Sequence, residues 1–430
     1  MIWSFLLLIS VLLVVDFYGF RGIRKLFSHH KLTPLRYFML RSYWIVDIVF
    51  ILFAIAWALY IRSSNLEEYE KYRKFFWIMG GFMLIFIPKT SFFLFTVFYD
   101  LKLLFISINR KIFHHRTRFH IFLTRFRHSL VVPAAGFIVA ILMFTITLHG
   151  VGFGRFNFNV VEQQIWFDDL PEAFDGYRIV QFSDTHLGSY SQTDAVQIGL
   201  RVINQLSPDL IVFTGDMVNN EALEAEKFIP YFQELQASDG LYSVLGNHDM
   251  GDYRRWGTIA EKEANIQQLV NVQKEMGFHV LMNEHAFIRR GNDSIMIAGV
   301  ENWGLPPFAQ YGDLNKALSV STVDAATFTI LLSHDPSHWK AQIIPESDVN
   351  LTLSGHTHGM QFGISNRFFS WSPVQLKYNE WSGLYHDGYQ KLYVNTGFGF
   401  LSFPGRIGMP PEITLIILRK NPEHLASHKP

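Results

Sequence analysis

Two histidines, His356 and His358, are separated by a single residue in the stretch LTLSGHTHG, which covers positions 351–359. The apolar residues before them predict a short strand, Val349–Leu353, that runs into a tight turn. In extended backbone, side chains at positions i and i+2 point in the same direction. Because imidazole is the commonest metal ligand in proteins, this pair is a candidate for half of a metal site. Taken alone, such a pair is a weak signal, because surface or core histidines explain it more often than metal binding does.

Four other apolar runs end in the same manner, with ligand-type side chains directly after the last apolar residue. These predicted strands are Arg178–Phe182, Leu210–Phe213, Leu241–Leu245 and Phe328–Leu332. The residues that follow them are Asp184, His186, Asp216, Asn247, His248, Asp249 and His334. Ligands in α/β sheets gather beyond the carboxyl ends of strands. Asp and Asn are common in caps and turns, but five such ends, with five of the 18 histidines, favour a metal site.

The composition of the chain restricts the kind of metal that this site can hold. The 430 residues include no cysteine, so the ligands must be imidazole, carboxylate, amide or hydroxyl groups. Such donors favour Mn, Fe or Zn. The formal net charge is +0, so charge gives no reason to expect a nucleic-acid partner.

Helix-like stretches separate several of the predicted strands, namely Asp194–Leu206, Glu221–Leu235 and Ile259–Met276. A hairpin is predicted from two strands that a short Gly-Asn-Asp turn connects, and two late strands follow. These four strands are His285–Arg290, Ser294–Val300, Leu392–Val394 and Ile413–Leu418. The alternation of strands and helices predicts an α/β domain over residues 151–430.

The first 150 residues have a different character, with four long apolar runs: Met1–Phe20, Tyr43–Ile61, Phe75–Tyr99 and Leu130–Leu148. Each is close to the ~20 residues that cross ~30 Å of hydrocarbon. No Lys or Arg precedes the first run, which favours an uncleaved span over a signal peptide. Residues 1–150 are therefore predicted to form a transmembrane region of about four helices. Buried core helices are the alternative.

The distribution of basic residues predicts how these spans cross the membrane. Loops 21–41 and 100–129 are rich in Lys and Arg, whereas Ser63–Lys74 mixes acids and bases. The positive-inside rule then places the catalytic domain outside the cytoplasm, in a multi-pass integral membrane protein. Within the spans, Asp47 and Lys89 are predicted to pair. If Pro88 splits the third run into two half-helices, the parity of the spans changes.

The order D-x-H, G-D, G-N-H-D, H and G-H-x-H resembles the calcineurin-like metallophosphoesterase superfamily over Tyr177–Leu418. LPEAFDGYRIVQFSDTHLG, at positions 170–188, and RIGMPPEI, at 406–413, are similar to its membrane-associated bacterial phosphoesterases. The resemblance implies an α/β sandwich of two sheets flanked by helices. It also implies a dinuclear metal centre with a shared water that loses a proton and attacks phosphorus.

The resemblance also implies a role for each candidate residue. One metal ion would be held by Asp184, His186, Asp216 and His358, and the second by Asp216, Asn247, His334 and His356. His248 would stabilise the phosphoryl oxygens or protonate the leaving oxygen. Asp249 is a candidate for orienting His248. Arg406 is a candidate contact for the substrate phosphate, with a salt bridge or surface role as the alternative.

The implied function is a membrane-anchored hydrolase of phosphate mono- or diesters with two divalent metal ions and a metal-bridged hydroxide. The anchor favours lipid, lipid-linked or envelope substrates and makes membrane lipid an expected partner, while soluble substrates stay open. UDP-diacylglucosamine hydrolases of the same superfamily act on a lipid at the cytoplasmic face, opposite to the orientation predicted here. The alternative class is a non-catalytic sensor or scaffold that binds metal or phosphate. The complete ligand set together with His248 argues against that alternative.

Overall fold

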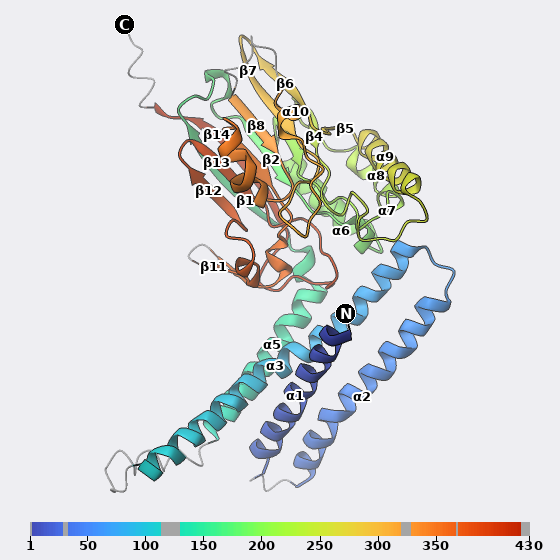
Figure 1. Cartoon of the computed structure of the whole chain (residues 1–430), viewed down its shortest axis with the longest axis vertical. Helices are drawn as coiled ribbons and strands as arrows, with labels where there is room; N and C mark the ends of the chain where they lie inside the picture. The colour runs from blue at the N-terminus through green and yellow to red at the C-terminus, as the bar shows by residue number, and fades with distance from the viewer. Residues whose placement is uncertain (1, 29–32, 113–129, 320–327, 367–368, 423–430) are drawn as a thin grey trace. The chain divides into compact units, whose positions relative to one another are not determined.

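The computed structural model of the chain describes residues 2–28, 33–112, 130–319, 328–366 and 369–422 (Figure 1). These residues form two compact units. One contains Met1–Asn65 and Trp77–Gly150, and the other contains Leu66–Phe76 and Val151–Pro430. The first unit is helical and the second contains two large β-sheets.

The helical unit is built from the long apolar helices that the sequence predicts. Its elements are α1 (Ile2–Leu26), α2 (Thr33–Ser63), most of α3 (Glu68–Ile112) and α5 (Val131–Gly152). Three stretches are long and apolar enough to cross a membrane: Pro34–Ser63, Glu68–Ile108 and Val131–Phe156. Helix α3 continues through Pro88, so the predicted third span is one helix rather than two half-helices. Residues 113–129 of the second basic loop lie outside the described residues.

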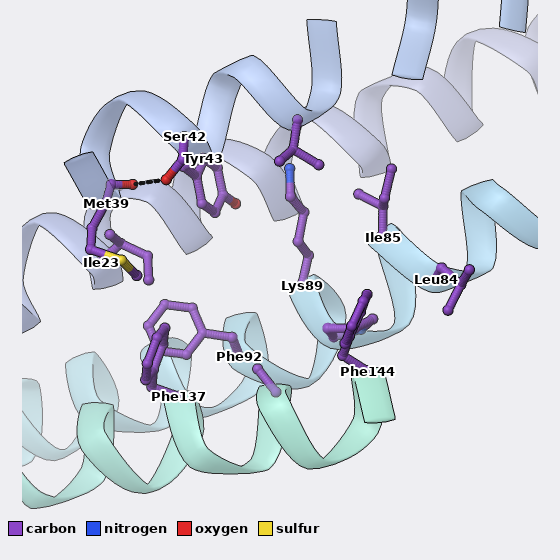
Figure 2. A pocket seen from close by; sticks show the side chains of 13 residues that line it. Ile23, Met39, Ser42, Tyr43, Leu84, Ile85, Lys89, Phe92, Phe137 and Phe144 are labelled. Carbon is purple, nitrogen blue, oxygen red and sulfur yellow. Dashed lines mark hydrogen bonds between the residues drawn. The ribbon is translucent and has the colours of Figure 1, made fainter. Parts of the chain in front are cut away.

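Lys89 of α3 lies between carboxylates from two other helices. Its Nζ is 2.8 Å from Oδ1 of Asp16 and also contacts the carboxylate of Asp47, so the predicted pair is present with a third member. The Tyr43 ring centroid is 4.2 Å from the same Nζ. Lys89 and Tyr43 line an apolar cavity of about 260 Å³ together with side chains from all four helices. Figure 2 shows the side chains that line it. The charges thus lie within a largely apolar helix bundle.

The second unit contains two six-stranded sheets, as the sequence predicts for an α/β sandwich (Figure 1). All neighbouring strands are parallel except the pairs β14–β2, β12–β13 and β6–β7. In order across the first sheet, the strands are β1 (Asn159–Phe167), β14 (Glu412–Lys420), β2 (Arg178–Phe182), β3 (Leu210–Phe213), β4 (Leu241–Ser243) and β5 (Phe278–Val280). Across the second they are β12 (Gly383–Asp387), β13 (Gln390–Val394), β9 (Leu351–Ser354), β8 (Phe328–Leu332), β7 (Asp293–Gly299) and β6 (Glu284–Arg290).

Strand β3 shows why these segments form a sheet that is covered on both faces. Leu210 and Val212 belong to the apolar cluster shared by the two sheets. Ile211 and Phe213 belong to a second cluster with α6 (Asp194–Gln205) and α9 (Ile259–Glu275). Successive side chains of a strand point to opposite faces, so an uninterrupted apolar run fits a strand buried on both sides.

One predicted helix differs from the structure, and four short strands were not predicted. The predicted helix Glu221–Leu235 is two short helices, α7 (Leu223–Glu226) and α8 (Ile229–Phe232), and the second has Pro230 in its first turn, where the missing N–H is tolerated. Strands β5 and β12 were not predicted, because the first has three residues and the second is a partly exposed edge strand of mixed polarity. A small ribbon, β10 (Ile364–Ser365) with β11 (Ser370–Trp371), was also not predicted.

Candidate metal centre

The structure brings the seven predicted metal ligands to one place at the carboxyl ends of five strands. Strands β2, β3 and β4 are parallel neighbours in the first sheet, and β8 and β9 are parallel neighbours in the second. The loops that follow them carry Asp184, His186, Asp216, Asn247, His334, His356 and His358. Residues separated by up to 174 positions in the chain therefore meet at one edge of the sandwich.

Five of these seven residues have a left-handed backbone, with φ between 45° and 73°. They are Asp184, His186, Asp216, His356 and His358. Non-glycine residues rarely adopt this conformation, and such strain concentrates at functional sites. Close packing holds the loops in place: a Cβ on Gly355 would lie 1.9 Å from the Ser183 hydroxyl oxygen, so only glycine fits before His356.

The first group of candidate ligands contains Asp184, His186 and His358, whose ligand atoms all lie within 4.8 Å of one another. Nε2 of His358 is 3.2 Å from Oδ1 of Asp184 and 3.0 Å from Nε2 of His186. All three side chains are buried. The arrangement directs two ring nitrogens and one carboxylate oxygen at a common point.

The second group contains Asp216, His334 and His356, again within 4.8 Å. Nε2 of His334 is 3.2 Å from Oδ2 of Asp216 and 3.3 Å from Nδ1 of His356. Asn247 joins this group, because its Oδ1 is 2.8 Å from Nδ1 of His356. Oδ2 of Asp216 is also 3.6 Å from Nε2 of His186, so this one carboxylate is adjacent to both groups.

The donor set fits two divalent cations. With metal–ligand bonds of 2.0–2.2 Å, neighbouring donors of a tetrahedral site lie about 3.4 Å apart, and the contacts above span 2.8–3.6 Å. Burial lowers the pKa of both His186 and His356, which favours the neutral imidazole that a metal requires. Burial raises the pKa of Asp216, but the nearby histidines, His334 first, outweigh it and hold that pKa well below its usual range.

Hydrogen bonds behind the ligands determine which ring nitrogen faces the centre. Nδ1 of His334 is 2.7 Å from the carbonyl oxygen of Thr214, so it donates there and leaves the Nε2 lone pair for the centre. Nε2 of His356 is 2.8 Å from the Tyr378 hydroxyl, which donates to Asp335 at 3.2 Å. This fixes Nδ1 as the nitrogen of His356 that faces Asn247.

The orienting residues were not assigned from the sequence. Asp335 follows His334 directly, so its position after a predicted strand was a usable signal. Tyr378 and Tyr253 carry no such signal, because neither directly follows a strand: Tyr253 lies six residues after Asn247, and Tyr378 lies in a segment that carries no ligand. Tyr253 accepts a bond of 2.8 Å from Nδ2 of Asn247, which turns the amide oxygen towards the histidines.

His248 lies at the pocket beside the two groups and is held by a backbone carbonyl. Its Nδ1 is 2.8 Å from the carbonyl oxygen of Asn219, and its ring centroid is 4.9 Å from that of His186. The Nδ1–H therefore donates to Asn219 and leaves Nε2 for other contacts. Burial lowers the pKa of His248. Asn219 is the partner that orients His248, and the sequence offered no signal for it because only its backbone takes part.

Asp249 does not perform the orienting role that the sequence predicted. Its carboxylate accepts four backbone N–H groups rather than the His248 ring. Oδ2 accepts from Asp216 at 2.8 Å and Gly246 at 2.9 Å, and Oδ1 accepts from Met217 at 2.8 Å and Val218 at 3.1 Å. Asp249, in the loop after β4, thus binds the backbone of the loop after β3. Asp249 therefore positions Asp216.

Arg406 was predicted as a candidate contact for the substrate phosphate, with a salt bridge or surface role as the alternative. Its side chain is 2% exposed and sits behind His358, with Nη2 3.3 Å from Nδ1 of that histidine. The guanidinium donates to the carbonyl oxygens of Gly399 at 2.8 Å and Gly397 at 2.9 Å, among others. This geometry favours a positioning role for Arg406 over a contact with substrate.

A pocket of about 380 Å³ opens at the two ligand groups. Asp216, Asn247, His248, His356 and His358 line it on the metal side. The remaining lining is aromatic, aliphatic and cationic: Tyr253, Phe308, Thr357, Met360, Pro373, Val374, Lys377, Tyr378 and Leu401. A polar floor with an apolar wall suits a phosphate ester whose other substituent is apolar.

Known proteins share both parts of the chain. Residues 177–360 match the family model described as calcineurin-like phosphoesterase. Residues 1–155 match the model described as probable calcineurin-like phosphoesterase, transmembrane domain. An uncharacterized metallophosphoesterase of Bacillus subtilis, YkuE, is 33% identical over 63% of this chain and 90% of its own length.

Two further relatives extend the comparison. The transmembrane protein with metallophosphoesterase domain of Danio rerio is 29% identical, over 61% of this chain and 57% of its own length. The UDP-2,3-diacylglucosamine pyrophosphatase LpxG of Chlamydia trachomatis is 27% identical, over 58% of this chain and 86% of its own. The match thus spans little more than half of the Danio rerio protein.

Paired sheets with histidine, carboxylate and amide groups at their strand ends define a class of metal-dependent hydrolases. The chain belongs to the calcineurin-like metallophosphoesterase family, as its motifs predicted, and carries that family's transmembrane domain. It is a hydrolase that acts on phosphoester bonds.

Proposed function

We propose that this chain is a membrane-anchored hydrolase of phosphate mono- or diesters that works with two divalent metal ions. Residues 1–150 form the anchor in this proposal, and residues 151–430 form the catalytic domain. The observation that carries it is the position of Asp216, whose Oδ2 is 3.6 Å from His186 and 3.2 Å from His334. One carboxylate shared by two ligand groups is the arrangement that a dinuclear centre requires.

The proposed ligands follow from the two groups. Asp184, His186, Asp216 and His358 hold the first ion, and Asp216, Asn247, His334 and His356 hold the second. The ions are Mn, Fe or Zn, because nitrogen and oxygen donors suit them. When bound, they supply Lewis acidity for the phosphoryl oxygens and lower the pKa of a reacting water. Asn247 contributes a neutral oxygen, which limits the negative charge that a phosphate must approach.

His248 is the proposed catalytic residue of the chain itself. The bond from its Nδ1 to Asn219 fixes the ring at the pocket and leaves Nε2 for the substrate. From there it can donate a hydrogen bond to a phosphoryl oxygen or a proton to the leaving oxygen. Asp249 and Arg406 are proposed as positioning residues: Asp249 holds Asp216 in place, and Arg406 holds His358 in place.

The proposed substrate class is a phosphate ester carried by a lipid or another envelope component. The anchor supports this class, and so does the apolar wall of the pocket. The LpxG relative is named for a diacylated nucleotide sugar, which is a substrate of that kind. The catalytic domain is proposed to lie outside the cytoplasm, and the uninterrupted helix α3 supports the parity on which this depends.

A chromogenic assay tests the proposed activity. Purified full-length protein with Mn²⁺ should hydrolyse bis(p-nitrophenyl) phosphate or p-nitrophenyl phosphate, and a chelator should abolish the reaction until Mn²⁺ is restored. The ratio of the two rates decides between diester and monoester preference. Folded, metal-loaded protein that is inactive on both esters would contradict the proposal.

A further inference from the structure

Two membrane-entering segments belong to the phosphoesterase unit itself. One is Val151–Phe156, the end of the candidate span Val131–Phe156. The other is Leu66–Phe76, which contains the start of the candidate span Glu68–Ile108. Contacts inside this one unit therefore show which of its loops lie closest to the points where the chain enters the bilayer.

The first of these segments packs against the loop at residues 398–411. Nη1 of Arg155 donates to the carbonyl oxygen of Pro404 at 3.2 Å, and the guanidinium lies 4.9 Å from the Phe400 ring centroid. The Phe158 ring, two residues past the span, lies 4.5 Å from the ring of Phe398. The entry point of the last span is thus fixed to this loop.

The same loop forms part of the wall of the metal pocket. Nε2 of Gln361 donates to the carbonyl oxygens of Phe403 and Gly405, each at 2.8 Å. Oε1 of Gln361 accepts the backbone N–H of Leu401 at 2.6 Å, and Leu401 lines the pocket. Gln361 lies three residues after His358. The loop at residues 398–411 therefore contacts both the end of the last candidate span and the segment that carries His356 and His358.

The second segment contacts the loop that follows β2. Nη1 of Arg73 is 3.4 Å from the carbonyl oxygen of Tyr190, and Nζ of Lys227 donates to that same oxygen at 2.9 Å. Tyr190 follows the short turn that begins directly after His186. The second segment therefore lies against the loop that carries His186, and the first lies against a loop that is hydrogen-bonded to the segment after His358.

An apolar surface borders the pocket at this edge, and we call it the rim: Met360, Ile364, Trp371 and Leu376. Their side chains are 56%, 51%, 43% and 93% exposed. Ile364 and Trp371 are directly paired between β10 and β11. Met360 lines the pocket, and the Ser372 hydroxyl donates to the Gly359 carbonyl oxygen at 2.7 Å, which ties the ribbon to the pocket segment.

A basic side chain, that of Lys377, lies next to the rim in the sequence. Lys377 follows Leu376, lines the pocket and has its Nζ 4.2 Å from the ring centroid of Phe308. Exposed apolar side chains in a contiguous group mark a contact surface. Tryptophan and lysine are both typical of residues that enter the membrane interface, where the ring is buried among headgroups and the cation reaches phosphate.

We propose that the rim docks on the surface of the bilayer that anchors the chain. A second consequence rests on the proposed function: the pocket then takes the phosphate headgroup of a lipid in that leaflet. The short link between the last candidate span and the first sheet favours the bilayer over a soluble partner as the surface that covers the rim. Only Asn157 and Phe158 separate the span Val131–Phe156 from β1, which begins at Asn159. At ~3.6 Å per residue this link reaches about 11 Å, so the local concentration of lipid at the unit is very high.

The chain has no cysteine, so single-cysteine labelling tests the docking directly. Leu376→Cys and Ile364→Cys receive an environment-sensitive fluorophore in the full-length protein. Tyr389→Cys is the matched control, because Tyr389 is 55% exposed and directly precedes β13, which runs parallel to β9, so it lies at the end of the sheet opposite the metal ligands. The proteins are reconstituted in vesicles of phosphatidylcholine and phosphatidylglycerol, with a nitroxide-bearing lipid as the quencher.

The rim labels should be quenched by the lipid nitroxide several-fold more than the control label. Equal quenching at all three positions would overturn the docking. Rim labels that are shielded from both the lipid nitroxide and aqueous iodide would also overturn it, in favour of a second copy or another protein on the rim. Because quenching requires no turnover, an inactive wild-type protein would count against the proposed function and leave this result intact.

Competition tests the substrate class. Phosphatidic acid in the vesicles should raise the apparent KM for the chromogenic ester, whereas glycerol 3-phosphate at the same total concentration should raise it several-fold less. Equal competition by the two phosphates would overturn the lipid headgroup as the preferred ligand.

Discussion

His248 is the residue whose role is easiest to separate from metal binding. Its ring is bonded through Nδ1 to the Asn219 carbonyl and is not part of either ligand group. His248→Ala should therefore retain both metal ions while the rate of hydrolysis falls by about 10²–10⁴-fold, the usual contribution of a general acid or base. Metal content and kcat measured on the same preparation check this. Loss of metal equal to that in His334→Ala would make His248 a ligand.

His338 gives a residue-scale prediction about pH. Its Nδ1 is 2.8 Å from the Ser333 hydroxyl and its Nε2 is 2.9 Å from Oε1 of Gln342. Burial lowers the pKa of His338 to about 4. The unfolded chain binds this proton near pH 6.5, so stability is complete above that pH and falls as the pH drops towards 4. The full effect is about 3 kcal/mol.

The matched variant is His338→Gln, in which the side chain at position 338 does not titrate. The difference in Tm between wild-type protein and variant should shrink as the pH is lowered from 7 to 5, because only the wild type loses this contribution. Parallel pH profiles of Tm would show that His338 is not the titrating group.

At the residue scale, the ligand types were predictable and their supporting partners were not. Asp184, His186 and Asp216 follow apolar runs directly, and this position carries a signal in the sequence. Asn219 and Thr214 act through backbone carbonyls, which every residue has. Asp249 was predicted at the right place but with the wrong partner, because sequence adjacency to His248 does not show where its carboxylate points.

At the scale of elements, helix α3 carries a cation whose partners come from two other helices. Lys89 is bonded to Asp16 and Asp47, and all three side chains are less than one fifth exposed. Removing one member of a buried ionic group leaves uncompensated charge and costs about 3–5 kcal/mol. Lys89→Met should therefore lower Tm strongly in detergent-solubilised protein.

The control removes every charge together. Asp16→Asn, Asp47→Asn and Lys89→Met combined should recover much of the lost Tm, because no carboxylate is then left unpaired. If Lys89→Met alone has the Tm of the wild type, the cluster contributes nothing to the stability of the helical unit.

The elements themselves show where sequence patterns suffice. Strands β2, β3 and β8 were predicted to the residue, because each is an apolar run with a polar residue at its end. Strand β12 is half exposed at a sheet edge, and its composition gives no period-2 apolar signal. The ribbon of β10 and β11 is fixed by contacts such as Ser372 with Gly359, which depend on tertiary structure.

At the scale of the whole molecule, the side of the membrane that carries the catalytic domain is a testable prediction. The two basic loops should both stay in the cytoplasm, because Lys and Arg near span ends resist translocation. Fusions placed after Lys420 should then be active with a reporter that works only outside the cytoplasm. Activity confined to the reporter that works inside would reverse the topology and favour a cytoplasmic-face lipid nucleotide as substrate.

The central claim is that Asp216 holds two metal ions together, and metal content tests it most directly. Purified full-length protein, washed free of loosely bound ions, should contain close to two divalent ions per chain by elemental analysis. Asp216→Ala should lose metal and activity together, since its carboxylate is adjacent to both ligand groups. Folded wild-type protein that binds one ion or none after saturation with Mn²⁺, Fe²⁺ or Zn²⁺ would contradict the account.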